Sequence, residues 1–416
     1  MKLLNDAIFA HPPTAGRLSD AAFVAAMIRV EAALALAQGG LGMVPPEIAE
    51  EIANVQVSGE SLMGGVQSAG VPVPALLSEM RAALSPAAAS GLHYGATSQD
   101  IVDTALSLLY RDAMTALIEA LSGLLTSLEA KARGHASVPM LARTRGQIAT
   151  PVSFALRLSS WASPLIALEA DVDAIIGGAC RVSLGGASGS LSALAPHGPA
   201  IRASMAENLG LADAPTWHSD RGGIQALAAW LTRLTGALGK MAGDVLIATR
   251  GEVAEMRVGG GGGSSTMPHK ANPVLAEALR AARPVAQGLS AGLAAAAIHA
   301  EERDGVHWAV EWKLMPELLE VAGAALERAT ALIGRLEPMP EAMAARLDAV
   351  PGVFAEAAVF SMMPEVSREE ATKRVKDALA AGVPLSDLTE LPTAQSLAQT
   401  ADEAAWEVFA KRKSGG

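Results

Sequence analysis

Cysteine, aromatic residues and positive charge are all scarce in this chain of 416 residues. The single cysteine, Cys180, excludes an internal disulfide bond and any zinc cluster built from cysteines. Aromatic residues make up 3% and charged residues 18%, whereas 50% of the residues are hydrophobic. The core must therefore consist mainly of Ala, Leu, Val, Ile and Met. Such a core suits closely packed helices better than sheets, which favour β-branched and aromatic residues.

The balance of charge is acidic, with 32 Lys and Arg against 43 Asp and Glu. No cluster of Lys and Arg stands out against the net charge of −11, so we expect no nucleic-acid partner. Two long stretches without charge, residues 182–200 and 284–300, are both interrupted by Gly, Ser and His. We interpret them as buried segments and not as membrane spans. The N-terminal residues 1–6 carry a charge too early for the apolar core of a signal peptide, and no small-residue cleavage site follows such a core. The expectation is a cytoplasmic protein with no membrane partner.

Apolar residues recur at intervals of three and four in five long runs, which predict helices beginning near residues 101, 154, 224, 274 and 308. Pro284 and Pro316 fall inside the last two runs and are expected to kink or break them. The fold class predicted is all-α, with the long helices in one extended bundle. Clusters of proline suggest boundaries between three domains. These are an N-terminal helical domain over 1–96, the bundle over 97–337 and a small helical domain over 338–416. A helix is expected to open at Ser367, with Glu369 and Glu370 in its first turn.

The segment 259–273, Gly-Gly-Gly-Gly-Gly-Ser-Ser-Thr-Met-Pro-His-Lys-Ala-Asn-Pro, is the most informative part of the sequence. Five successive glycines do not serve helix or sheet stability, but they permit positive φ and a close approach of the backbone to a ligand. A P-loop does not fit, because Lys270 stands seven residues after Gly263 (270 − 263) and no strand is expected before it. A helix expected from about Asn272 would offer free N–H groups to an anion. We interpret the segment as a carboxylate-binding loop and not as a flexible linker.

This segment resembles the signature of the fumarase/aspartase superfamily, Gly-Ser-x-x-Met-x-x-Lys-x-Asn, with matches at Gly263, Ser264, Met267, Lys270 and Asn272. Residues 93–104 and 142–151 resemble two further conserved regions of that superfamily. The resemblance implies an all-α subunit of three domains and a homotetramer in which each active site draws on three chains. It also implies that there is neither a metal nor an organic cofactor.

Within the superfamily, four segments resemble the bacterial 3-carboxy-cis,cis-muconate cycloisomerases: residues 95–100, 183–191, 215–221 and 302–312. Three positions depart from the expected pattern. Arg145 stands where adenylosuccinate lyases carry a histidine and cycloisomerases usually a tryptophan, while Glu301 and Ala309 stand where cycloisomerases carry histidines. Because these positions belong to the site region, the exact substrate stays open.

The activity implied by the resemblance is the conversion of 3-carboxy-cis,cis-muconate to 4-carboxymuconolactone in protocatechuate catabolism. The reverse of this lactonisation is a β-elimination, in which negative charge moves onto a carboxylate and must be stabilised by prearranged donors. The superfamily places its base at the serine that matches Ser264, and Lys270 is the expected partner of the developing charge. Together these two form the catalytic prediction, although no general acid is assigned. The residues expected to bind substrate are His93, Thr97, Ser98, Arg145, Gln147, His218, Ser265, Met267, Asn272 and Arg303, with Arg221 as a further cation.

Several alternatives remain open at this point. The chain could be another lyase of the superfamily that releases fumarate, such as an adenylosuccinate lyase, or a non-catalytic scaffold like the lens crystallins of that superfamily. Thr97 and Ser98 could simply cap a helix. Arg145 could form a surface ion pair, and Trp217 could pack in the core. The histidines outside the matched segments are expected to be ordinary surface or core residues.

Overall fold

The computed structural model describes residues 4–260, 262–263, 267 and 270–414 of the chain. Helices dominate it, so the all-α prediction is confirmed. The helices are α1 Pro12–Arg17, α2 Asp20–Gly40, α3 Pro46–Ala53, α4 Leu62–Ala69, α5 Val73–Ala83, α6 Pro86–Gly91, α7 Ser98–Gly134, α8 Phe154–Ala179, α9 Gly198–Leu209, α10 Gly222–Ala248, α11 Val274–Ala295, α12 Gly305–Arg335, α13 Pro340–Asp348, α14 Ala355–Met362, α15 Arg368–Ala381 and α16 Ala394–Ser414, together with the short 3-10 turns η1 Leu4–Ile8, η2 Ser192–Leu194, η3 Pro351–Phe354 and η4 Leu385–Asp387.

Strands occur only as short antiparallel pairs among the described residues. They are β1 Pro139–Thr144 with β2 Gln147–Ser153, β3 Met256–Val258 with β6 Leu336–Pro338, and β4 Gly262–Gly263 with β5 Ala271–Asn272. Each pair ties together the ends of helices and adds no sheet to the core. The five long helices expected from the apolar spacing are α7, α8, α10, α11 and α12.

The chain divides into two compact units, each assembled from three separate stretches of sequence. The first unit holds residues 1–119, 171–235 and 282–324, and the second holds residues 120–170, 236–281 and 325–416. Both draw on the long helices. The three-domain boundaries at 96 and 337 stay a prediction.

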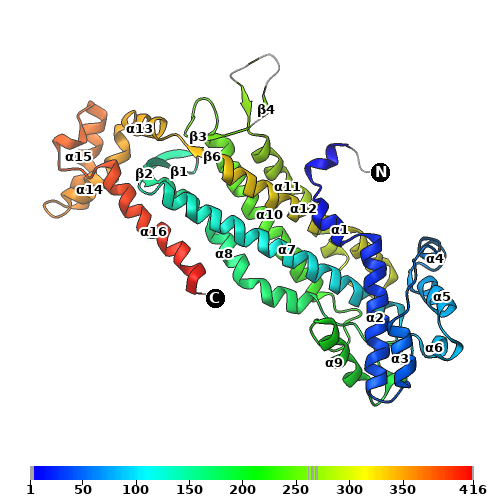
Figure 1. Cartoon of the computed structure of the whole chain (residues 1–416). Coiled ribbons are helices and arrows are strands. Elements are labelled where there is room, and N and C mark those ends of the chain that lie inside the picture. The colour runs from blue at the N-terminus through cyan, green and yellow to red at the C-terminus, as the bar shows by residue number, and fades with distance from the viewer. Residues whose placement is uncertain (1–3, 261, 264–266, 268–269, 415–416) are drawn as a thin grey trace. The chain divides into compact units, whose positions relative to one another are not determined.

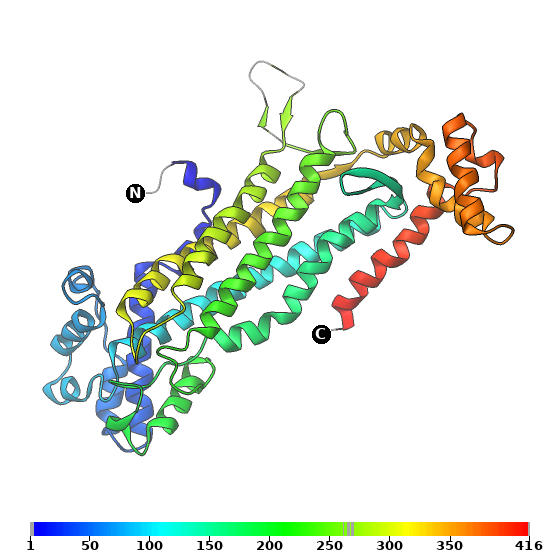
Figure 2. The ribbon, with the colours of Figure 1, turned by 180° about the vertical axis from the view of Figure 1, so that it is seen from behind.

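In the first unit, α2 packs against α3 and α9, as Figures 1 and 2 show from opposite sides. Its core is aliphatic, as the composition predicted, with Met27, Val30, Leu34 and Ile101 fully buried. Pro316 lies within α12, and that helix continues through it without a break. Burial of Met315 and Leu318 beside the proline offsets the local cost of the missing N–H, which is about 3 kcal/mol.

The same holds for α11, which continues through Pro284, so neither helix breaks at its proline, and the alternative expectation of a kink stays a prediction. In the second unit, Ser367 caps α15 as predicted, because its hydroxyl accepts a hydrogen bond from the Glu370 amide at 3.2 Å. The residues after 338 contain their own small core, made by Ala358, Met362, Ala371, Val375, Ala378 and Leu385.

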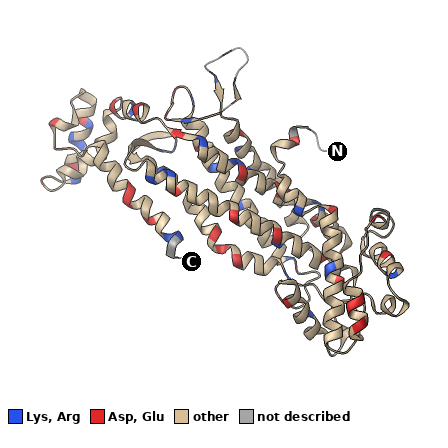
Figure 3. Cartoon of the chain, viewed as in Figure 1, with Lys and Arg blue, Asp and Glu red and all other residues tan. Residues whose placement is uncertain are grey.

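One helix among those described, α7, is long and apolar enough to cross a membrane by length and composition. The core helix of a soluble protein meets the same criterion, and 39% of the most apolar window of α7 is buried within the chain. Its first turns carry Asp100 and Asp103, both buried and both hydrogen-bonded inside the first unit. Figure 3 shows acidic and basic residues interspersed along the described helices.

Candidate active site

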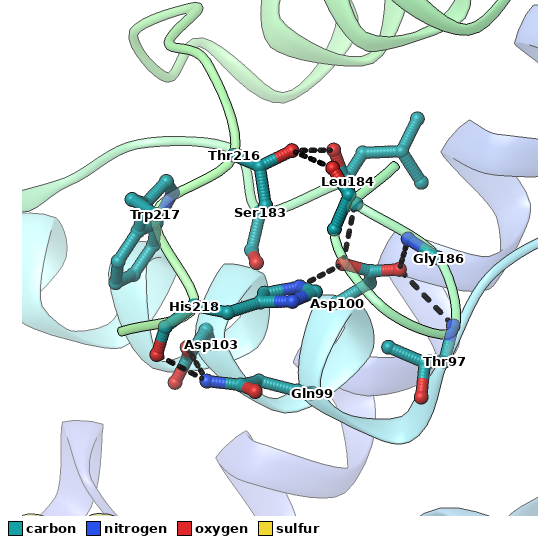
Figure 4. Close-up of polar contacts among 12 residues, drawn as sticks. Thr97, Gln99, Asp100, Asp103, Ser183, Leu184, Gly186, Thr216, Trp217 and His218 are labelled. Carbon is teal, nitrogen blue, oxygen red and sulfur yellow. Dashed lines mark hydrogen bonds and ion pairs between the residues drawn. The ribbon is translucent and has the colours of Figure 1, made fainter. Parts of the chain in front are cut away.

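Asp100, in the first turn of α7, is the centre of a buried polar cluster in the first unit (Figure 4). Its carboxylate accepts backbone N–H bonds from Gly185 at 2.8 Å, Gly186 at 2.9 Å and Thr97 at 3.0 Å. The Nε2 atom of His218 lies 2.7 Å from its Oδ1 atom. A carboxylate with several N–H partners is a strong acceptor, because charge-assisted hydrogen bonds are stronger than neutral ones. These bonds join the start of α7, the loop after α8 and the segment before α10.

The two glycines of this cluster are required by space and by backbone conformation. A Cβ atom on Gly185 would stand 2.6 Å from Thr216 Cγ2 and 2.7 Å from His218 Cε1. Gly186 has a φ of +69°, and a Cβ atom there would stand 3.0 Å from the Gly95 carbonyl oxygen. Any side chain at either position would move the loop away from Asp100. This explains the Gly-Gly pair within the segment 183–191.

His218 is buried, and its Nδ1 atom has no hydrogen-bond partner among the described residues. When the imidazole is neutral, a proton on Nε2 can be donated to Asp100, which leaves Nδ1 as the acceptor nitrogen. A buried polar atom without a partner is costly, and a ligand group that donates a hydrogen bond would satisfy it. His218 therefore has the chemistry expected of a residue that binds substrate.

Gln99 connects this cluster to a cation. Its side-chain nitrogen donates to the His218 carbonyl at 2.9 Å and to Asp103 at 3.1 Å. Its side-chain oxygen accepts a bond from the Arg303 Nε atom at 3.0 Å, and Arg303 also donates to the Ala187 carbonyl at 3.1 Å. All of these partners of Arg303 are neutral oxygens, and no described carboxylate pairs with it. The guanidinium is exposed and is available to an anionic ligand.

Arg221 is different, and its expected role as an additional cation for substrate is wrong. It is buried between two carboxylates, with its Nη1 atom 2.8 Å from Asp103 and its Nε atom 3.0 Å from Glu311. Burial alone would lower the pKa of Arg221, but these two carboxylates outweigh it and raise that pKa. Trp217 is buried beside it, with the Arg221 guanidinium 4.8 Å from its ring centre. Trp217 therefore packs in the core.

His93 lies directly before the Gly95–Asp100 segment and has a positive φ of 63°. Its Nδ1 atom is 2.6 Å from the carboxylate of Glu31, which is buried on α2. Burial lowers the pKa of His93, but the hydrogen bond and the charge of Glu31 outweigh this effect, so the pKa is raised. The ring nitrogen on the Glu31 side is occupied, and only the other nitrogen is available to a ligand.

Two further candidates, Arg145 and Gln147, lie in the second unit at the turn between β1 and β2. Arg145 has a φ of 52° and is exposed, and Gly146 follows it with a φ of 79°. Among the described residues no carboxylate pairs with Arg145, so the alternative of a surface ion pair is not seen. The neighbouring Arg143 instead forms a bidentate pair with the buried Glu255, at 2.7 Å for both contacts. That pair anchors the hairpin that carries Arg145.

The signature segment also belongs to the second unit. Gly262 pairs with Asn272 and Gly263 with Ala271, which closes the segment into a narrow β-ladder. Lys270 is exposed, and Met267 is 42% exposed. Helix α11 begins at Val274, two residues after the expected start. The predicted Ser264 and Ser265 lie outside the described residues.

The structure therefore gathers the predicted residues in two groups. His93, Thr97, Ser98, His218 and Arg303 belong to the first unit. Arg145, Gln147, Met267, Lys270 and Asn272 belong to the second. Among the described residues, no group of three or more His, Cys, Asp or Glu side chains is placed to hold a metal ion.

Sequence reasoning missed Asp100 and Gln99 as organising residues. Both stand inside the recognised segment 93–104, but neither was chosen for a role. A local signal existed for Asp100. At the start of a helix, an acidic side chain three residues after a threonine commonly accepts the backbone N–H of that threonine, as Asp100 does from Thr97. Its other partners lie 85 to 118 residues away in sequence, which no local pattern can indicate.

Comparison with known proteins agrees with this geometry. A family model described as "Lyase" matches residues 23–288. The chain is 34% identical to a 3-carboxy-cis,cis-muconate cycloisomerase of Bradyrhizobium diazoefficiens, covering 83% of this chain and 79% of the relative. It is also 34% identical to a nitrosuccinate lyase of Streptomyces davaonensis, covering 86% and 80%.

A solved structure, that of the 3-carboxy-cis,cis-muconate lactonizing enzyme of Pseudomonas putida, superimposes with a TM-score of 0.89 at 28% identity. The match covers 100% of both chains. Family match, sequence identity and fold point in one direction: this chain belongs to the lyase family of the fumarase/aspartase superfamily.

Proposed function

We propose that this protein is a 3-carboxy-cis,cis-muconate cycloisomerase, which closes its substrate to 4-carboxymuconolactone. The observation that carries the proposal is the similarity to cycloisomerases of this name, in sequence over 83% of the chain and in structure over all of it. One carboxylate oxygen adds to a carbon–carbon double bond of the same molecule, and the neighbouring carbon gains a proton. A carbon–oxygen bond forms as the π electrons of the double bond take up the proton, which comes from solvent through the enzyme's acid group, and no oxidant or reductant is consumed.

The residues divide the chemical work in the following way. Negative charge develops on the carboxylate next to the carbon that carries the mobile proton, and Lys270 pairs with that charge while Asn272 donates a hydrogen bond. Arg303 and Arg145, neither of them paired with a described carboxylate, bind the remaining carboxylates. Ser264 moves the proton, a role for which a serine hydroxyl must be activated by neighbouring groups.

A direct assay tests the proposal. The purified protein is incubated with 3-carboxy-cis,cis-muconate, and the loss of ultraviolet absorbance is followed while NMR identifies the product. Formation of the γ-lactone supports the proposal. Absence of turnover, with release of fumarate from adenylosuccinate or nitrosuccinate in parallel reactions, would instead favour the second candidate, a fumarate-releasing lyase. That candidate is supported by the similarity to the nitrosuccinate lyase. It is also supported by Arg145, Glu301 and Ala309, which depart from the pattern of the cycloisomerases.

We also propose that the protein acts as a cytoplasmic homotetramer in the degradation of aromatic compounds, with active sites shared between subunits. The division of candidate residues between two units supports sharing, because each group is only part of a site. Sedimentation gives the oligomeric state. A mixture of the inactive variants Arg303→Ala and Lys270→Met, refolded together, regains activity if one site takes these residues from different subunits. No recovery from an assembled mixed tetramer would contradict shared sites.

A further inference from the structure

A second cationic site lies in the second unit, in a cavity of about 330 Å³. Its walls come from β1, the following turn, the first turns of α8 and the carboxyl end of α10 with the segment after it. Three arginines line it: Arg143, Arg157 and Arg250. Asp244 and Glu255 are the two carboxylates of the lining. The mechanism above uses none of these five side chains.

Both carboxylates are already engaged. Glu255 is buried and gives one oxygen to each terminal nitrogen of Arg143, at 2.7 Å in both cases. Asp244 accepts the Trp161 indole N–H at 2.7 Å and the ammonium of Lys240 at 2.5 Å. The Arg157 guanidinium lies at 3.7 Å from the same Asp244 oxygen, too far for a hydrogen bond.

Arg250 has no such partner. Among the residues that the structure describes, no side chain pairs with its guanidinium, and the side chain is exposed at the cavity. The lining holds the cations Arg143, Arg157 and Arg250 and the anions Asp244 and Glu255, an excess of 3 − 2 = 1 positive charge. In a chain with a net charge of −11, such a local excess needs a counter-ion.

We propose that this cavity binds a small organic dicarboxylate through Arg157 and Arg250. Among the described residues, neither Arg157 nor Arg250 is hydrogen-bonded to a carboxylate, so each is available to one carboxylate of a ligand. Guanidinium groups are suited to this because they can bind both oxygens of a carboxylate at once. The remaining lining is apolar, from Met140, Ile247 and Met256, and offers contact to a short hydrocarbon chain, which inorganic phosphate lacks. Gly146 borders the cavity, so an occupant would touch the turn that carries Arg145 and Gln147.

The site goes beyond the proposed function, because it requires no turnover and no residue of the signature segment. Its occupant has two possible sources with the same chemistry. The first source is the substrate of the enzyme, bound here either as a second molecule or through its distal carboxylates. The second source is a different dicarboxylate that acts as an effector.

Isothermal titration of the intact protein with succinate tests the site. The wild-type protein and Lys270→Met are expected to bind succinate here with equal affinity, while Arg250→Gln and Arg157→Gln weaken binding about tenfold or more. Arg233→Gln serves as the control, because this exposed arginine of α10 pairs with Asp171 and does not line the cavity. Circular dichroism checks that each variant is folded.

Binding that is unchanged in both Arg250→Gln and Arg157→Gln, or that disappears in Lys270→Met alone, would overturn the proposal. When binding is lost as expected, kinetics assign the source. A raised KM in Arg250→Gln with competitive inhibition by succinate identifies the substrate as the occupant. An unchanged KM with non-competitive modulation by succinate identifies an effector. Either kinetic result supports the site.

Discussion

His218 and Asp100 form a buried pair, with Nε2 and Oδ1 separated by 2.7 Å, although the two residues are 118 positions apart in sequence. The contact locks the segment before α10 onto the first turn of α7. Removing the carboxylate leaves the imidazole and the N–H groups of Gly185 and Gly186 without an acceptor. We therefore expect Asp100→Ala to lower the free energy of unfolding by about 3–5 kcal/mol, measured by urea denaturation. A loss below about 1 kcal/mol would contradict the central position given to Asp100.

The buried pairing of Arg221 leads to a second prediction. Arg221→Met leaves Asp103 and Glu311 facing each other without a cation, so we expect a loss of about 3–5 kcal/mol. The matched control is Arg233→Met, whose ion pair with Asp171 is half exposed on both sides and is worth about 1 kcal/mol or less. Denaturation curves of the two variants should differ clearly. Equal stability would show that the pair with Asp103 and Glu311 makes no special contribution.

The contact between His93 and Glu31 predicts a dependence of stability on pH. The pKa of His93 is raised in the folded state above the ordinary value of 6.5, because the bond to Glu31 outweighs burial. Its contribution to stability is therefore complete below pH 6.5 and is lost as the pH rises through the raised pKa. The thermal midpoint of the wild type should fall over this interval more than that of His93→Gln. Parallel curves for the two proteins would refute the assignment.

Lys270 is predicted to stabilise developing charge on the substrate. Lys270→Met removes that charge while keeping most of the length of the side chain, and the loss of a comparable donor costs about 2.7–4 kcal/mol, or 10²–10³ in kcat. Lys313→Met is the control, since Lys313 is an exposed lysine paired with Glu317 on α12. Steady-state kinetics on 3-carboxy-cis,cis-muconate give the comparison. An unchanged kcat in Lys270→Met would remove this residue from the mechanism.

Ser264 is predicted to transfer the proton. In Ser264→Ala the positioned hydroxyl is absent, and general acid–base catalysis of this kind contributes about 10²–10⁴ in rate. Turnover by the folded variant within tenfold of the wild type would mean that another group moves the proton. The variant Thr266→Ala, two residues further along the segment, controls for a general disturbance of the glycine-rich region, because Thr266 is given no role in the reaction.

Periodicity was enough to locate the long helices, because an apolar residue every three to four positions describes a helix face wherever it is placed. The run predicted from residue 101 corresponds to α7, and the serine before Glu369 and Glu370 is indeed a cap. No helix break occurs at Pro284 or Pro316, and local propensity misses this because it counts only the missing hydrogen bond. Packing along the rest of the helix outweighs that single loss.

The amino-acid order by itself determined the all-α class, the superfamily and the glycine-rich segment with Lys270, since each depends on residues that are neighbours along the chain. Only the tertiary structure decided which charged groups are free. Arg221 and Arg303 are both arginines in matched segments, yet Arg221 is buried between two carboxylates, whereas Arg303 is hydrogen-bonded only to neutral oxygens within the described part of the chain. The electrostatic energy of a side chain depends on distances to groups that are remote in sequence, and folding alone sets those distances.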